Sequence, residues 1–65
     1  MKKINQLTVN QIIEYIDAHQ DNNVTIIAQY LEITKEDAYD LIVEWACDIA
    51  FIEDYINKLK NKYLP

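Results

Sequence analysis

Apolar residues recur at helical spacing in the first third of the chain. One amphipathic stripe is formed by Val9, Ile12, Ile13 and Ile16. Thr8 or Asn10 can cap the open N–H groups at the start of this helix with a side-chain oxygen. Residues 1–8 are predicted to be a polar lead-in. We therefore expect a first helix from about Val9 or Asn10 to Gln20.

A turn and two further helix starts follow. Asp21-Asn22-Asn23 is typical of a turn, because short polar side chains bond to neighbouring backbone. A short second helix is predicted from Thr25 to about Leu31. A third begins after Thr34, whose hydroxyl can cap it, and Asp37 three residues later gives a variant of the capping box.

A longer apolar stripe crosses the second half of the chain. Its members are separated alternately by four and three residues: Ala38, Ile42, Trp45, Ile49, Ile52, Ile56, Leu59 and Tyr63. This heptad pattern predicts one helix from Lys35 to Tyr63, which would be about 43 Å long. The alternative is a break near Cys47-Asp48, which would fold the last helix back into a compact four-helix bundle.

The long stripe also predicts a homodimer. The first two helices are too short to cover it, so its second half needs a partner. The residues predicted to mediate self-association are Ile49, Ile52, Ile56, Leu59 and Tyr63.

These patterns together predict one all-α domain over residues 1–65. A three-helix core spans residues 9–46, and a C-terminal helical extension spans residues 47–65. The chain has no glycine and one proline, so tight β-turns are poorly provided for and helices are well tolerated.

The middle of the chain resembles the helix-turn-helix core of winged-helix and related small regulators. The residues that carry the resemblance are a small Ala28 between two helices, Leu31 and Ile33 at the turn, a capping Thr34, and inward Ala38 and Ile42. The resemblance covers about residues 9–46 and implies a three-helix fold whose third helix reads DNA. Two features depart from it: Glu32 occupies a turn position often filled by glycine, and no pair of strands follows to form a wing.

The distribution of charge argues against that implied DNA binding. All eleven acidic residues lie between Glu14 and Asp54 with one lysine, Lys35, so this stretch has a net charge of −10 within a chain of −5. Affinity for a duplex comes mainly from Lys and Arg, and the chain has no arginine. Carboxylates on the third helix would be repelled by phosphates. Such a field disfavours nucleic acid and anionic membranes.

Candidate catalytic and metal-binding groups are sparse. There is no serine, and a Cys47 nucleophile would need His19 beside it together with a third orienting group. Without glycine there is no phosphate-cradling loop, and the lone cysteine and lone histidine are too few for a zinc site. Carboxylates on a convex helix are a poor calcium cage. We predict no enzymatic activity, no cofactor and no metal.

Aromatic and apolar residues beside the long stripe are interspersed with carboxylates. In a protein-binding surface, aromatics anchor the partner and acids orient a basic one. The residues predicted to form such a surface are Glu36, Asp37, Tyr39, Asp40, Val43, Glu44, Phe51, Asp54 and Tyr55. Alternatively, Tyr39 and Tyr55 widen the core face of the helix.

The sequence therefore predicts a small acidic protein-interaction module that binds a basic protein surface. Its size, acidity and lack of arginine resemble small accessory proteins of phages and mobile elements, including inhibitors. In a narrower hypothesis, the carboxylates from Glu32 to Asp54 imitate DNA phosphates. The alternative is a dimeric helix-turn-helix transcriptional regulator, with Lys2 and Lys3 as a basic arm.

The expected location is the cytoplasm. No apolar run follows the first lysines to make a secretory signal, and no run is long enough to span a membrane. Cys47 is alone, so no disulfide within the chain indicates an oxidising compartment.

Overall fold

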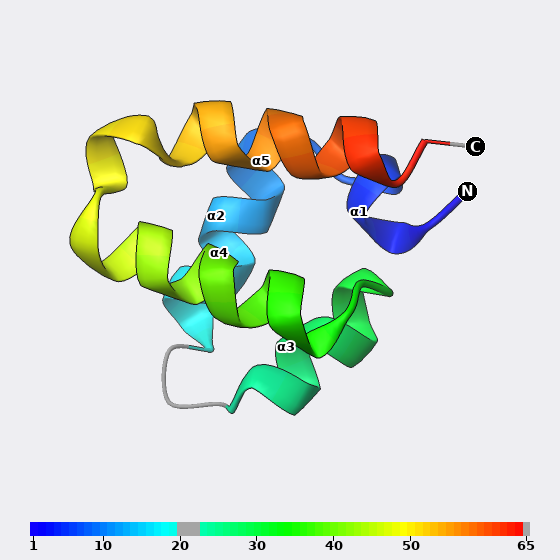
Figure 1. Cartoon of the computed structure of the whole chain (residues 1–65), viewed down its shortest axis with the longest axis horizontal. Helices are drawn as coiled ribbons and strands as arrows, with labels where there is room; N and C mark the ends of the chain where they lie inside the picture. Colours follow the sequence, from blue (N-terminus) through cyan, green and yellow to red (C-terminus); the bar gives the residue numbers. More distant parts are fainter. Residues whose placement is uncertain (20–22, 65) are drawn as a thin grey trace.

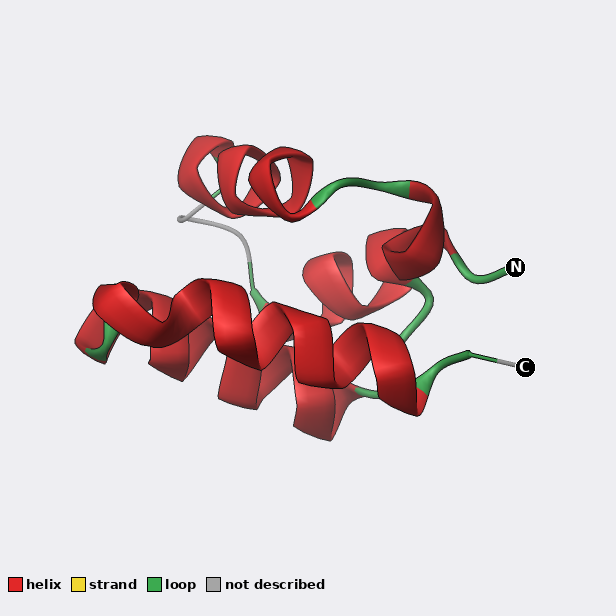
Figure 2. Cartoon of the chain, turned by 90° about the horizontal axis from the view of Figure 1, so that it is seen from above, coloured by secondary structure: helices red, strands yellow, loops and turns green. Residues whose placement is uncertain are grey.

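The computed structural model describes residues 1–19 and 23–64, and all regular structure in these ranges is helical. The helices are α1 (Lys3–Gln6), α2 (Val9–Ala18), α3 (Val24–Leu31), α4 (Lys35–Cys47), the 3-10 helix η1 (Ile49–Phe51) and α5 (Ile52–Lys62). Helices α4 and α5 run antiparallel, joined through η1, and both chain termini lie at one end of the molecule (Figure 1; Figure 2). The predicted all-α class is confirmed.

Side-chain caps start the three helices of the central region. Thr8 accepts a hydrogen bond from the Gln11 N–H at 3.1 Å, and the Gln11 side chain accepts from the Thr8 N–H at 2.9 Å. This reciprocal pair is a capping box at the start of α2. Asn23 caps α3, and Thr34 caps α4 by accepting from the Asp37 N–H at 3.1 Å. Of the two candidate caps for the first helix, Thr8 and Asn10, the structure uses Thr8, and the predicted cap at Thr34 is confirmed.

The predicted boundary between the first two helices lies partly outside the described residues. Helix α2 ends at Ala18, with His19 as its C-cap, and α3 begins at Val24. Gln20, the predicted end of the first helix, and Asp21-Asn22 of the predicted turn fall in the stretch that the structure does not describe.

Glu32 ends α3 in the left-handed conformation, with φ 61° and ψ 42°. A side chain with a Cβ adopts this conformation at a cost of about 1–2 kcal/mol, and glycine escapes that cost. The turn lets the Ile33 N–H donate to the Ala28 carbonyl at 3.0 Å. The sequence thus keeps the turn without the usual glycine.

The prediction of one continuous helix from Lys35 to Tyr63 is wrong. Helix α4 ends at Cys47, and Asp48 leaves the helical region at φ −146° and ψ 54° while its N–H still bonds to the Glu44 carbonyl. The chain then turns through η1 and returns as α5 alongside α4 (Figure 1). The structure therefore has the compact arrangement that was the alternative, and the apolar stripe closes on itself within one chain.

This closure corrects the self-association prediction. Ile52, Ile56 and Leu59 are buried in the core of the chain, so they do not form an accessible surface. Tyr63 is half-buried and is engaged with the start of α4. Of the five predicted residues, Ile49 alone is exposed.

The first eight residues are also more structured than a polar lead-in. Helix α1 places Ile4 fully inside the core. Asn5 Nδ2 donates to the Lys60 carbonyl at 3.2 Å, and the Lys60 ammonium donates to the Leu7 carbonyl. The two ends of the chain are thereby tied together. Four residues are too few for a helical period to show in the sequence.

The core draws on every α-helix of the described chain. Its largest side chains, each less than 2% exposed, are Ile4, Ile12, Ile16, Ile27, Leu31, Leu41 and Ile56. The small Ala28 and Ala38 are buried where α3 and α4 pack together. On α4, Tyr39 and Val43 remain exposed.

Candidate functional site

Four large apolar side chains are exposed along α4 and η1. Tyr39 and Val43 lie one helical turn apart on α4 and are 59% and 39% exposed. Ile49 and Phe51, where the chain turns toward α5, are 58% and 59% exposed. We call these four residues the α4–η1 strip. Several exposed large apolar residues on neighbouring elements are typical of an interaction surface.

A row of carboxylates lies beside this strip. Glu36, Asp40 and Glu44 recur every fourth residue and therefore share one side of α4. We call them the carboxylate ridge. Burial raises the pKa of Tyr55 on α5, and the charges of Asp40 and Asp37 raise it further. Glu44 also contributes to this rise, so Asp40 and Glu44 of the ridge lie toward Tyr55 on α5.

The structure separates the nine predicted partner-binding residues by exposure. Six are exposed: Glu36, Tyr39, Asp40, Val43, Phe51 and Asp54. Glu44 and Tyr55 are half-buried, and Asp37 is buried. All nine lie on α4, η1 and α5, the antiparallel pair of Figure 2.

Asp37 has an internal role, which corrects its assignment to the surface. Its carboxylate accepts hydrogen bonds from the Lys62 ammonium at 2.9 and 3.0 Å and from the Tyr63 hydroxyl. Burial raises the pKa of Asp37, but the hydrogen bonds from Tyr63 and Lys62 outweigh burial and hold the pKa below its ordinary value. The contact fastens the end of α5 to the start of α4.

The lysines near the C-terminus are partly used in internal contacts. Lys62 pairs with Asp37, and Lys60 bonds to the Leu7 carbonyl. At the other end of the chain, the Lys3 ammonium lies 5.4 Å from the centre of the Tyr30 ring. The hydrogen bond to Asp37 raises the pKa of Lys62, and the nearby charge of Glu36 adds to this rise.

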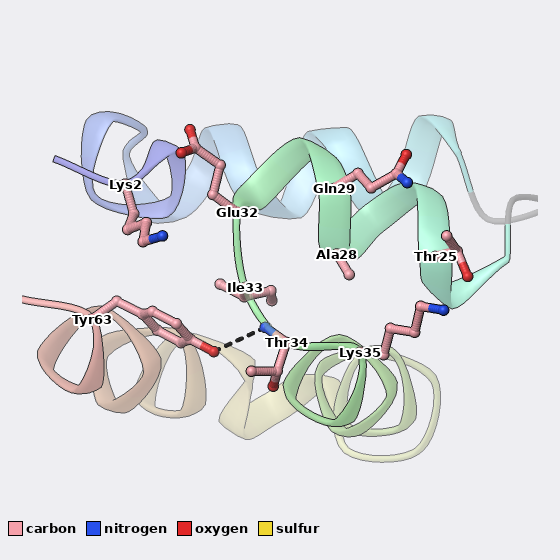
Figure 3. A pocket seen from close by; sticks show the side chains of 9 residues that line it. All are labelled: Lys2, Thr25, Ala28, Gln29, Glu32, Ile33, Thr34, Lys35 and Tyr63. Carbon is pink, nitrogen blue, oxygen red and sulfur yellow. Dashed lines mark hydrogen bonds between the residues drawn. The ribbon is translucent and has the colours of Figure 1, made fainter.

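Two other lysines line a groove between α3 and the start of α4. The groove has a volume of about 480 Å³, and its lining residues are Lys2, Thr25, Ala28, Gln29, Glu32, Ile33, Thr34, Lys35 and Tyr63. Lys2 and Lys35 lie toward opposite ends of it (Figure 3). The Tyr63 hydroxyl accepts a hydrogen bond from the Thr34 N–H at 3.0 Å, which closes one side. Sequence reasoning singled out the lysines but missed Thr25 and Gln29, which carry no distinctive local signal.

The candidate nucleophile and its candidate base lie on different elements. Cys47 is exposed at the end of α4. His19 ends α2, where its ring stacks on Tyr15 with centroids 4.2 Å apart and its Nδ1 lies 2.9 Å from the Tyr15 carbonyl. Within residues 1–19 and 23–64, no three His, Cys, Asp or Glu side chains are placed to hold a metal ion.

Two further findings concern membranes and known proteins. In the part of the chain that the structure describes, no helix combines the length and apolar character needed to cross a bilayer. No protein-family model, curated protein or solved structure matches the chain.

Proposed function

We propose that this chain is a non-catalytic protein-interaction module that binds a basic surface of another protein. It would act as an inhibitor or adaptor of the kind found in phages and mobile elements. One observation carries the proposal: Tyr39 and Val43 of the α4–η1 strip lie beside the carboxylate ridge on α4. Such a surface offers apolar anchors and a negative field to the same partner.

The arrangement of positive charge supports the same partner. The Lys60 ammonium is bonded to the Leu7 carbonyl and the Lys62 ammonium is paired with Asp37, so both lysines are engaged in contacts within the chain. Glu36 and Asp40 of the ridge are exposed to solvent. A negative surface speeds encounter with a cationic partner, and the apolar strip slows its departure.

Imitation of DNA needs more than the ridge. Glu36, Asp40 and Glu44 are spaced about 6 Å apart along the helix axis. One strand of a duplex presents a phosphate about every 3.4 Å. The ridge alone thus has about half the charge density of one strand, and the narrower hypothesis also requires Asp48, Glu53 and Asp54 beyond α4.

Affinity capture with paired variants tests the proposal. Wild-type chain and a Tyr39→Ala, Phe51→Ala variant are each used to capture proteins from the source lysate after nuclease treatment. We expect a basic protein that the wild type retains and the variant loses. The matched control is Ile26→Ala with Leu64→Ala, two exposed apolar residues outside the strip, and it should retain the partner. Capture that the strip variant leaves intact would refute the proposed surface.

The second candidate function is the helix-turn-helix regulator, and one observation favours it. Lys2 and Lys35 line a single groove with Thr25, Gln29 and Thr34 beside the start of α4. Glu32 lies in the same groove and Glu36 next to it, and both would oppose phosphates. Direct titration with duplex DNA separates the two candidates.

A further inference from the structure

We propose that the α4–η1 strip receives an amphipathic α-helix of the basic partner, with Lys or Arg along one flank. This inference rests on the proposed function and specifies which element of the partner binds.

The strip holds half of the large apolar residues that are exposed in the described chain, and its four members are close together in sequence. Eight large apolar residues are exposed, and four of them form the strip. Two of the others, Met1 and Leu64, are at the chain ends, and the remaining pair, Ile26 and Tyr30, lies on α3. The strip is therefore the place where a partner would remove the most apolar surface from water.

The alternation of large and small side chains along the strip is suited to packing against a partner helix. Ala46, an exposed small residue, lies at the i+7 position from Tyr39 and separates, in sequence, the bulky pair on α4 from the bulky pair on η1. Ala50 is exposed between Ile49 and Phe51. Small residues flanked by large ones let a second helix approach to the usual 8–10 Å between axes.

Two further features favour an α-helix of the partner: the length of the strip, and the lack of a β-strand edge in residues 1–19 and 23–64. Tyr39, Val43 and Ala46 follow an i, i+4, i+7 pattern, which covers about 10 Å of α4. Anchors at i, i+4 and i+7 on a partner helix cover the same distance. An extended peptide would instead need a β-strand edge to join, and residues 1–19 and 23–64 contain no strand.

Charge selects a basic helix over a second copy of this chain. The carboxylate ridge borders the strip on one side, and Asp48 and Asp54 are exposed where the chain turns. A two-fold dimer through the strip would place the same acidic surface on both sides of the contact. Each copy carries a net charge of −5, so the two copies would repel. A flank of Lys or Arg complements the ridge instead.

The test uses three synthetic helical peptides of about 18 residues. The first has leucines at i, i+4, i+7 and i+11 with lysines along one flank. The second has the same composition in a permuted order without an apolar face, and the third has glutamates in place of the lysines. Binding to the full chain is measured by calorimetry at low and at moderate salt. We expect the first peptide to bind at least about tenfold more tightly than the second, and the third not to bind.

Two matched variants locate the contact. Val43→Asp and Ile26→Asp each add one negative charge at a similarly exposed apolar site, 39% and 41% exposed. If apolar contact on the strip carries binding, Val43→Asp weakens it about tenfold while Ile26→Asp does not. If charge alone carries binding, both variants tighten it. Circular dichroism is used to check that each variant is folded.

The outcomes separate the inference from the proposed function. Equal binding of the first two peptides, lost on neutralising Glu36 and Asp40, refutes the helix while the basic-partner proposal stands. Failure of both lysine peptides to bind refutes the inference and counts against the proposal. A wild-type dimer that disappears in Val43→Asp would identify a second copy as the occupant and overturn the inference.

Discussion

The carboxylate of Asp37 is held by Lys62 and Tyr63 where α4 and α5 meet. Its folded pKa lies below its ordinary value, which is about 3.9 in an unfolded chain. The folded state therefore binds this proton less readily than the unfolded state does. The stability that the contact contributes is fully present above about pH 4 and is lost as the pH falls through the folded pKa.

We expect Asp37→Asn to lower the free energy of unfolding by about 1–3 kcal/mol at neutral pH, because it weakens hydrogen bonds to a buried group. The difference from wild type should shrink well below pH 4, where wild-type Asp37 is itself protonated. Urea unfolding followed by Trp45 fluorescence measures both values. Asp40→Asn, at an exposed carboxylate, is the control. A difference that is as large in acid as at neutral pH would contradict the charge-based account of this contact.

Glu32 offers a second prediction at the scale of one residue. Its positive φ of 61° costs free energy that glycine does not pay. We expect Glu32→Gly to be about 1 kcal/mol more stable than Glu32→Ala in thermal or urea unfolding. Both variants lose the hydrogen bond from the Lys3 N–H to the Glu32 carboxylate, so the comparison isolates the backbone. A glycine variant no more stable than the alanine variant would show that the turn is relaxed.

Single residues with a local role were the easiest to predict. Thr8 or Asn10 was expected to cap α2 and Thr34 to cap α4, and Glu32 stood out at a turn position often filled by glycine. These roles depend on neighbours within a few residues. Asp37 was misassigned because its partners, Lys62 and Tyr63, are distant in sequence and meet it only after α5 folds back.

At the scale of elements, the decisive feature is the end of α4 at Cys47. Neither Gly nor Pro marks it, and the heptad stripe continues across it unchanged. The same stripe is compatible with one long helix that packs against another molecule. It is equally compatible with two shorter helices that fold back and bury the stripe within one chain. Burial of Ile52, Ile56 and Leu59 within one chain favours the hairpin. A local pattern cannot show the stability gained by this burial, because that stability depends on contacts between α5 and the rest of the core.

Two conservative substitutions test this arrangement. Ile56 is fully buried in α5, whereas Ile49 is 58% exposed in η1. We expect Ile56→Val to cost about 0.5–1.5 kcal/mol and Ile49→Val less than about 0.5 kcal/mol in urea unfolding. Equal costs would indicate that the two residues share one environment, as they would on a continuous helix packed against a second copy.

For the whole molecule, the structure removes the basis of the predicted dimer. The α5 residues that were to form it are internal, and the described chain measures 29 × 23 × 19 Å with its termini together. We expect sedimentation equilibrium at low salt to give a mass near 7.7 kDa. A mass near twice that value, unchanged in Val43→Asp, would require a dimer contact outside the α4–η1 strip.

Composition predicted the fold class and suggested the charge of the partner. It did not predict how the surface is arranged. The absence of glycine and the helical periods sufficed for an all-α fold, and the acidic middle of the chain suggested a basic partner. The groove between Lys2 and Lys35 could not be foreseen as a unit, because α1, α3, α4 and the end of α5 meet there only in three dimensions (Figure 3).

Titration of a labelled random duplex with the full chain at low salt tests the central claim most directly, because it asks whether the acidic surface rejects a polyanion. We predict no saturable binding up to about 100 µM, since non-specific DNA binding requires a net gain from Lys and Arg at the phosphates. Micromolar binding that falls with added salt and is lost in Lys2→Gln with Lys35→Gln would contradict the account and favour the regulator.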